Sequence, residues 1–234
     1  MKHFLYLAIN IFTLSYPLFK SWDARVNMYK KWNHLLPAIA AVTLFFLVFD
    51  YYFTKWGVWQ FNPKYITGIY FTNLPLEEIL FFITTFYACL FVYEVMNYFI
   101  KDNIWEKYAP YISTILVIAN LSIAFIYSDL LYTFAHLFMA AITIIVHHIV
   151  LGNKVAGRFY ISYLVCLIPF LLMNGILTAT PVVIYNNSEN LGLRIGTIPI
   201  EDTMYCLQML LMNVTIYEYL NIKKESKMLN TKLV

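Results

Sequence analysis

Two pairs of acidic residues have the types and spacing needed for proton-transfer chemistry. Each pair follows a proline by two and three positions, at the start of a long apolar segment: Pro75 with Glu77 and Glu78, and Pro199 with Glu201 and Asp202. Proline fits the first turn of a helix, where its missing N–H has no intrahelical partner. Burial and a second carboxylate nearby keep some acids protonated at neutral pH. Four such groups at one end of a bundle supply a general acid and a base.

A purely structural role competes with this interpretation. Acids in a first helical turn stabilise the helix by complementing its dipole, and for one pair alone that role is the more frequent one. Carboxyl groups inside membrane-spanning segments are costly and are functional candidates by default. Because the same pair occurs twice in equivalent positions, a functional role is favoured.

Neighbouring helical residues point about 100° apart, so the two acids of a pair cannot share one face. We expect the first acid of each pair, Glu77 and Glu201, to face a pocket and the second to support it. Seven residues farther on, and on the same helical face, both segments carry a polar side chain, Thr84 and Gln208.

Four more polar residues flank the loop before each acid pair and form two matched sets, Asp50 with Asn174 and Asn62 with Asn186. Asp50 lies near the end of its apolar segment, where it could hydrogen-bond to the acid pair. Asn62 and Asn186 fit turn or cap positions better than a binding role.

Three aromatic residues follow the acid pairs closely: Phe81, Phe82 and Tyr205. Their ring faces would stabilise a cation, although core packing is the more frequent role of any one ring. Glu94 and Glu218 are also repeated, about 25 Å farther along the helix at 1.5 Å per residue. We interpret these two acids as interfacial and structural.

The elements that position these residues must be membrane-spanning helices. Of 234 residues, 61% are hydrophobic and only 12% are charged, against about 25% charged in a soluble domain. The three cysteines lie in apolar segments without CxxC spacing, which argues against disulfides or a zinc site. Seven apolar runs approach the length of about 20 residues that crosses a bilayer. They are about 3–19, 34–54, 76–99, 111–127, 130–149, 159–178 and 200–220.

An internal repeat relates the two halves of the chain. A shift of 124 residues aligns residues 50–95 with 174–219 without a gap, and most identities are Thr, Asn, Gly, Pro and Glu rather than apolar residues. The same shift places the first three runs on the last three and leaves the fourth unmatched. We therefore expect an all-α polytopic membrane protein with two parallel three-helix repeats joined by a linker helix, a 3+1+3 arrangement. The corresponding units are 1–100, 101–128 and 129–234.

Lysine and arginine are distributed unevenly between the two sides of this bundle. Four of the 16, Lys2, Lys55, Lys64 and Arg194, fall on one side, and the other twelve fall opposite. The positive-inside rule predicts an external N-terminus and a cytoplasmic C-terminus, with the acid pairs near the outer leaflet. No run concentrates positive charge, so a nucleic-acid partner is excluded.

Several other chemistries have no motif here. There is no GxGxxG for a flavin or nicotinamide, and five histidines are too few for a histidine-box di-iron site. The last apolar run holds no lysine for a retinal Schiff base, and no Asp-rich diphosphate motif occurs. We expect neither a cofactor nor a metal.

The two Pro-x-Glu-(Glu/Asp) motifs resemble those of the lycopene cyclase domain family. That family includes bacterial heterodimeric-type cyclases, archaeal fused forms and the cyclase part of fungal phytoene synthase–cyclase fusions. The resemblance covers nearly the whole chain, with both halves fused. The second motif continues Thr203-Met-Tyr-Cys where the first continues Ile79-Leu-Phe-Phe, which leaves room for two unequal sites.

The resemblance implies a lycopene β-cyclase, an intramolecular lyase or isomerase of carotenoid biosynthesis in the bacterial cytoplasmic membrane. An acid protonates the terminal double bond, the carbocation closes onto the polyene, and a base removes a proton to leave a β-ionone ring. The implied partners are lycopene or another C40 carotenoid and the lipid bilayer. A homo-oligomer and association with other carotenoid enzymes both stay open.

Two alternatives belong to other classes. Sugar carriers of the SWEET type share the 3+1+3 layout, and repeated membrane acids suit a proton-coupled transporter. The acids here cluster at one end rather than at the midplane, which favours the cyclase. The other alternative is a non-catalytic pigment-binding membrane protein.

Overall fold

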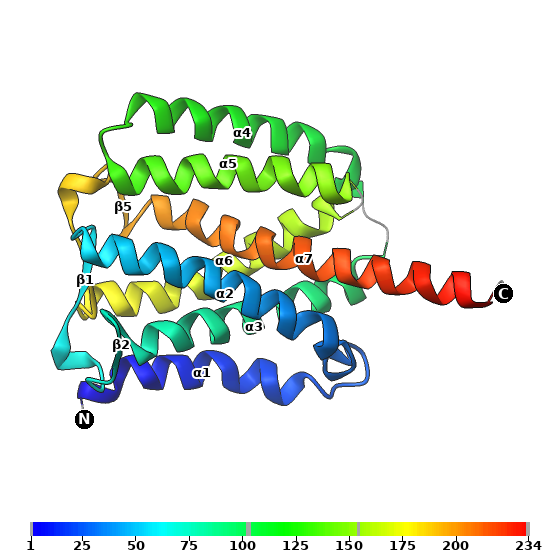
Figure 1. Ribbon diagram of the computed structural model, residues 1–234, viewed down its shortest axis with the longest axis horizontal. Helices are drawn as coiled ribbons and strands as arrows, with labels where there is room; N and C mark the ends of the chain where they lie inside the picture. Colours follow the sequence, from blue (N-terminus) through cyan, green and yellow to red (C-terminus); the bar gives the residue numbers. More distant parts are fainter. Residues whose placement is uncertain (1, 102–103, 154, 233–234) are drawn as a thin grey trace.

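A computed structural model describes residues 2–101, 104–153 and 155–232. In this part of the chain seven α-helices lie roughly side by side (Figure 1). They are α1 (Leu5–Lys20), α2 (Trp32–Lys55), α3 (Leu76–Phe99), α4 (Ala109–Ile126), α5 (Leu131–Leu151), α6 (Ala156–Ala179) and α7 (Glu201–Lys232).

Six short strands lie together at one end of the bundle, which we call the strand end (Figure 1). They are β1 (Trp59–Phe61), β2 (Tyr70–Phe71), β3 (Leu74–Pro75), β4 (Val183–Tyr185), β5 (Arg194–Ile195) and β6 (Ile198–Pro199). We call the opposite end, from which α7 extends, the tail end. The sequence patterns did not predict these strands, because each has only two or three residues.

Each predicted apolar run is a helix, and most helix ends lie within a few residues of the predicted ones. The exception is α7, which continues to Lys232, beyond the predicted end at 220. By length and composition, five helical segments of the described chain are able to cross a membrane. Helix α1, with 16 residues, and α7 are not among the five. The chain is therefore an all-α membrane protein.

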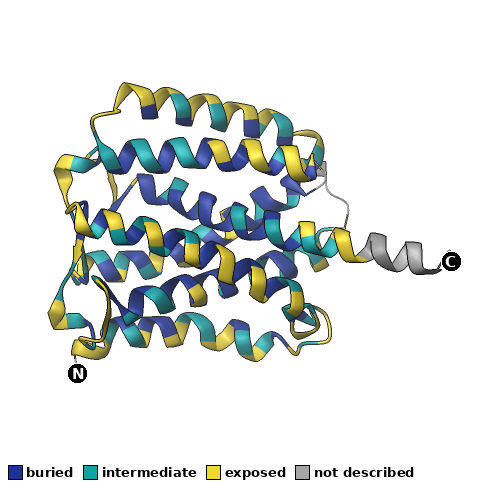
Figure 2. Cartoon of the chain, viewed as in Figure 1, coloured by how far each residue is buried: buried dark blue, intermediate teal, exposed yellow. Residues whose placement is uncertain are grey.

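The helices pack in two matching sets. Helix α1 packs against α3, and α5 packs against α7 in the same way. The sets also exchange contacts, because α3 packs against α6 and α7 packs against α2. Helix α4 lies at the edge of the bundle against α5 and leaves most of its surface exposed (Figure 2). The buried surface is concentrated where the acid-bearing helices α3 and α7 cross the middle.

Strand pairing fixes the loops at the strand end. The antiparallel pair β1–β4 joins the two halves, with Gln60 opposite Ile184 at its centre. Strands β2 and β3, and likewise β5 and β6, form local hairpins that lead into α3 and α7. Gly68 and Gly192 precede these hairpins with φ of 83° and 72°, a left-handed conformation that favours glycine. In both halves, therefore, the acid-bearing helix follows a loop of the same shape.

Candidate active site

The local hairpins place both acid pairs at the strand end. Pro75 pairs with Tyr70 and is the N-cap residue of α3. Pro199 pairs with Arg194, two residues before α7 begins. Each acid pair consequently lies in the first turn of its helix, as the proline spacing predicts.

Glu77 and Glu201 hold the loops that precede their helices. Glu77 is completely buried, and its Oε1 accepts a hydrogen bond of 2.6 Å from the Thr67 backbone N–H. Oε1 of Glu201 accepts one of 2.8 Å from the Leu191 N–H and one of 2.6 Å from Thr133 Oγ1. Neither acid lines the small pocket described below, and the second carboxyl oxygen of each is buried without a hydrogen-bond partner. Helical spacing separates the two acids of a pair by about 100° but does not say which one points inward.

Glu78 lies beside a second carboxyl group. Its Oε2 accepts a hydrogen bond of 2.5 Å from the Tyr6 hydroxyl. A second carboxyl group, Asp50, is 1% exposed near the end of α2 and close enough for its charge to act on Glu78, and neither of its oxygens has a hydrogen-bond partner in the described part of the chain. Neither carboxyl group belongs to an ion pair in the described part of the chain. Two buried carboxylates close together repel each other, so this arrangement is suited to holding a proton.

Asp202 occupies the equivalent position in α7 and has different partners. The hydroxyls of Tyr132 and Tyr185 donate to its two oxygens, the latter at 3.0 Å. Asn174, at the repeat position of Asp50, donates from Nδ2 at 3.2 Å. Burial raises the pKa of the Tyr185 hydroxyl well above its ordinary value, and the charge of Asp202 adds to this shift. The hydroxyl therefore stays protonated as a donor, and three donors surround the Asp202 carboxyl group.

A small pocket lies between these two groups. Glu78 and Tyr6 line one side, and Tyr132, Tyr185 and Asn174 line the other, in front of Asp202. The remaining walls are aromatic or apolar: Trp59, Phe81, Leu177, Val183 and Tyr205. One acid thus borders the pocket directly, and the other lies behind hydroxyl and amide groups.

Thr84 and Gln208 do not line this pocket. Thr84 donates a hydrogen bond of 3.1 Å to Asn10 Oδ1, and Asn10 Nδ2 donates one of 2.8 Å to the Glu77 carbonyl. Gln208 is buried and lies close to His136 of α5. Each residue therefore ties the acid-bearing helix to the first helix of its half, α1 or α5.

The remaining candidates divide between pocket, turn and core. Asn62 and Asn186 cap turns, each accepting a hydrogen bond of 3.1 Å from the backbone N–H two residues later. Phe82 is buried and stacks on Phe46 with ring centroids 5.8 Å apart, outside the pocket. Phe81 and Tyr205, which share one repeat position, both line it.

Six pocket residues were not among the predicted ones: the aromatic Tyr6, Trp59, Tyr132 and Tyr185, and the apolar Leu177 and Val183. For Tyr6 and Tyr132 a signal exists, because they precede the second acid of their half by similar distances, 72 and 70 residues. They are related by a shift of 126 residues rather than 124, so an ungapped comparison separates them. Trp59 and Tyr185 meet only through the β1–β4 pair, where they are directly opposite.

A second acidic network lies nearer the tail end. The Tyr217 hydroxyl donates to Glu94 Oε1 at 2.5 Å, and the Tyr93 hydroxyl donates to Glu218 Oε1 at 2.6 Å. Lys31 also forms an ion pair with Glu94. At 1.5 Å per residue, Glu94 lies about 24 Å along α3 from Glu78. The reciprocal contacts join α3 to α7 and are separate from the pocket.

Comparison with known proteins gives a family assignment. The family model described as lycopene cyclase matches residues 3–96 and matches again at residues 128–220. The two matches cover most of the chain and correspond to its two helical sets. Comparisons with curated proteins and with solved structures found no match. The chain belongs to the lycopene cyclase family and carries two copies of its domain.

Proposed function

We propose that this lycopene cyclase forms β-ionone rings by an acid-initiated reaction without net redox change. A proton adds to the terminal double bond and leaves a tertiary carbocation. The neighbouring double bond attacks this cation, which forms the ring bond and moves the charge into the ring. Loss of one proton then restores a double bond. One proton enters and one leaves, so the product is an isomer of lycopene and the enzyme is an intramolecular lyase.

The Asp50–Glu78 pair is the proton donor in this proposal. The observation that carries it is the buried carboxyl group of Glu78 on the wall of a small pocket, with the Tyr6 hydroxyl as its donor and the buried, unpartnered carboxyl group of Asp50 nearby. Proton transfer from a positioned acid typically contributes about 10²–10⁴-fold to a rate. Glu78 reaches the substrate, and Asp50 shares its proton.

Asp202 is the base that ends the reaction. Its three donors stabilise a carboxylate, and a carboxylate opposite the acid also stabilises the intermediate cation. The rings of Phe81, Trp59 and Tyr205 line the space between them, where their faces add cation–π stabilisation. The pocket wall lets a proton leave through the hydroxyl of Tyr132 or Tyr185 to Asp202.

The type of ring follows from the proton that is lost. Removal from the carbon that has just joined the ring extends the conjugated polyene and gives the β ring. Removal from other neighbouring carbons gives ε or γ rings with shorter conjugation. We propose the β ring because the conjugated product is the more stable one.

Two parallel three-helix units joined by α4 form the framework of the site in this proposal, with boundaries at 1–100, 101–128 and 129–234. The matched contacts of α1 with α3 and of α5 with α7 support it. The β1–β4 pair supports it as well, because Gln60 at its centre lies opposite its own repeat equivalent, Ile184. A rotation about the membrane normal should superpose the units, and an experimental structure that requires an inverted axis would refute this arrangement.

The proposed orientation puts the strand end outside the cell. Lys55, Lys64 and Arg194 lie in the strand-end loops or beside them, while most basic residues lie toward the other end. A reporter fused after Val234 tests this orientation. Activity of a reporter that works only in the cytoplasm is expected, and activity of an external reporter would reverse the topology.

Expression in a lycopene-producing bacterium tests the function itself. The wild-type chain should convert lycopene to β-carotene, and Glu78→Gln at equal membrane abundance should leave lycopene. Glutamine keeps the shape of the side chain but has no acidic proton to give. Unchanged lycopene with the wild-type chain, or wild-type conversion with Glu78→Gln, contradicts the proposal.

A further inference from the structure

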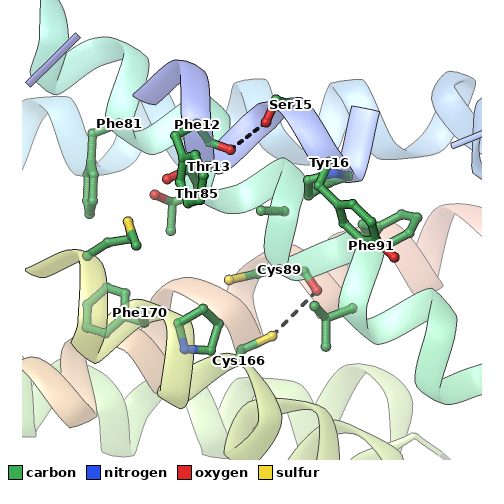
Figure 3. A pocket seen from close by; sticks show the side chains of 15 residues that line it. Phe12, Thr13, Ser15, Tyr16, Phe81, Thr85, Cys89, Phe91, Cys166 and Phe170 are labelled. Carbon is green, nitrogen blue, oxygen red and sulfur yellow. Dashed lines mark hydrogen bonds between the residues drawn. The ribbon is translucent and has the colours of Figure 1, made fainter. Parts of the chain in front are cut away.

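An apolar trough runs along α3 from the acid pocket toward the tail end. Its first part is a cavity between α1, α3 and α6, which Figure 3 shows from close by. Aromatic and small side chains face each other across it: Phe12 and Tyr16 from α1, Thr85 and Cys89 from α3, and Cys166 and Phe170 from α6. Its second part lies between α1 and α3 nearer the tail end. We call the two parts together the α3 trough.

Shared wall residues place the trough directly beside the acid pocket. Phe81 lines both the pocket and the first part, and Tyr16 and Phe91 line both the first and second parts. The second part ends at Phe99, at the end of α3. From Glu78 to Phe99, α3 rises by about 32 Å at 1.5 Å per residue. This length is close to the ~30 Å of hydrocarbon in a bilayer.

The trough is apolar for most of its length and opens to the surroundings of the bundle. The exposed rings of Phe12 and Tyr16 border it. The Ser15 hydroxyl on its rim is already bonded to the Phe12 carbonyl at 2.8 Å, so it does not require a polar ligand. Charged side chains line only the far part, where Asp23 pairs with Arg25 at an N–O distance of 2.9 Å and with Lys20 at 3.9 Å.

We propose that the α3 trough binds the linear chain of the polyene, with the end that reacts placed past Phe81 at Glu78. This inference rests on the proposed cyclase function and adds where the substrate lies and from which side it enters. A long, rigid, apolar chain aligned with the membrane normal fits the length and lining of the trough. It enters sideways from the lipid between α1 and α6.

The second half carries larger side chains at the matching positions. Thr85 and Ala88 of α3 correspond to Met209 and Met212 of α7, which are larger. Pro169 of α6 corresponds to Phe45 of α2. The second copy has thus filled the region that stays open in the first. One trough therefore serves both ends of the substrate, which must leave and return reversed for the second cyclisation.

A binding experiment separates this inference from the acid chemistry. The Glu78→Gln protein, made in lycopene-producing cells and purified in detergent, should carry bound lycopene. Adding Ala88→Phe, which fills the trough, should lower the lycopene-to-protein ratio by about tenfold or more. Ala88→Leu should lower it less. The matched control is Ala41→Phe at an exposed position of α2, which should leave the ratio unchanged.

Each outcome has a separate meaning. Equal lycopene with Ala88→Phe and Ala41→Phe, or phospholipid as the sole bound molecule in Glu78→Gln, overturns the trough. If Glu78→Gln still cyclises lycopene, the acid assignment is wrong. If adding Ala88→Phe to that variant also lowers the amount of bound lycopene, the trough assignment stands. In the otherwise wild-type protein, Ala88→Phe should leave lycopene without excess one-ring product. Accumulation of the one-ring product would indicate a second substrate site and overturn the single trough.

Discussion

The two copies of the domain build different surroundings for the same acidic position. Glu78 has one tyrosine donor and an acidic neighbour, Asp50, and it borders the pocket. Asp202 has three donors, one of them Asn174 at the position of Asp50. Because Asn174 replaces a carboxyl group with an amide, the second copy has one acidic proton fewer than the first. In the proposed mechanism, the first copy supplies the acid and the second copy supplies the base.

Asp50→Asn gives the first copy the amide that the second copy has at this position, and it should have the largest effect. An amide has no acidic proton to share with Glu78, so we expect cyclisation to fall by about 10²-fold or more. The measurement is the ratio of lycopene to cyclised carotenoids at equal membrane abundance. A wild-type ratio would show that Glu78 acts without Asp50.

Asp202→Asn tests the base role, and its expected effect is on the kind of product as well as on the amount. Without this base, the ring cation loses protons to less well-placed acceptors. We expect lower conversion and a larger share of ε- or γ-ring products, separated by chromatography and identified by absorption spectra. Conversion reduced with an unchanged product pattern would show that Asp202 does not select the proton.

Loss of the tyrosine hydroxyl should also slow cyclisation more in the first copy than in the second. Tyr6 is the tyrosine donor to Glu78, whereas Tyr132 shares Asp202 with Tyr185. A hydrogen bond to a charged group contributes about 1.5–3 kcal/mol. We therefore expect Tyr6→Phe to slow cyclisation more than Tyr132→Phe, measured as initial rates in membranes with added lycopene. Equal rates would remove the asymmetry between the two donors.

Glu77→Gln and Glu201→Gln probe the loops rather than the proton transfer. Each acid binds a backbone N–H of the preceding loop. Glutamine keeps one acceptor oxygen, so cyclisation should fall far less than with Asp50→Asn, while the thermal stability in detergent decreases. A loss of cyclisation as large as that of Asp50→Asn, without loss of stability, would show that Glu77 and Glu201 take part in proton transfer.

Asn62→Ala and Asn186→Ala should have the smallest effects. Each removes one turn cap on an exposed loop, which is worth about 1 kcal/mol. We expect near-normal product ratios and a slightly lower midpoint of thermal unfolding for both variants. A strong product change for either one would show that its loop contributes directly to the pocket.

Apolar length and proline spacing were sufficient to predict the seven helices and the first-turn position of the acids. The family resemblance, carried by Pro75 and Pro199, agrees with the family match. Whether Glu77 or Glu78 points inward could not be predicted, since it depends on which side of α3 the neighbouring helices cover. The tyrosines were missed because their contacts span about 70 residues, and Tyr185 depends on a strand pairing that leaves no periodic pattern.

The β1–β4 pair also means that the acid pocket is completed late in the synthesis of the protein. Ribosomes deliver the chain from its N-terminus, so Trp59 is translated long before its strand partner Tyr185. Until then the wall of the acid pocket is incomplete, and Glu78 has no opposing carboxylate. A nascent chain with only its first three helices inserted therefore lacks a closed acid site. The pocket wall and its opposing carboxylate are both present only after the β4 loop and the first turn of α7 have been translated.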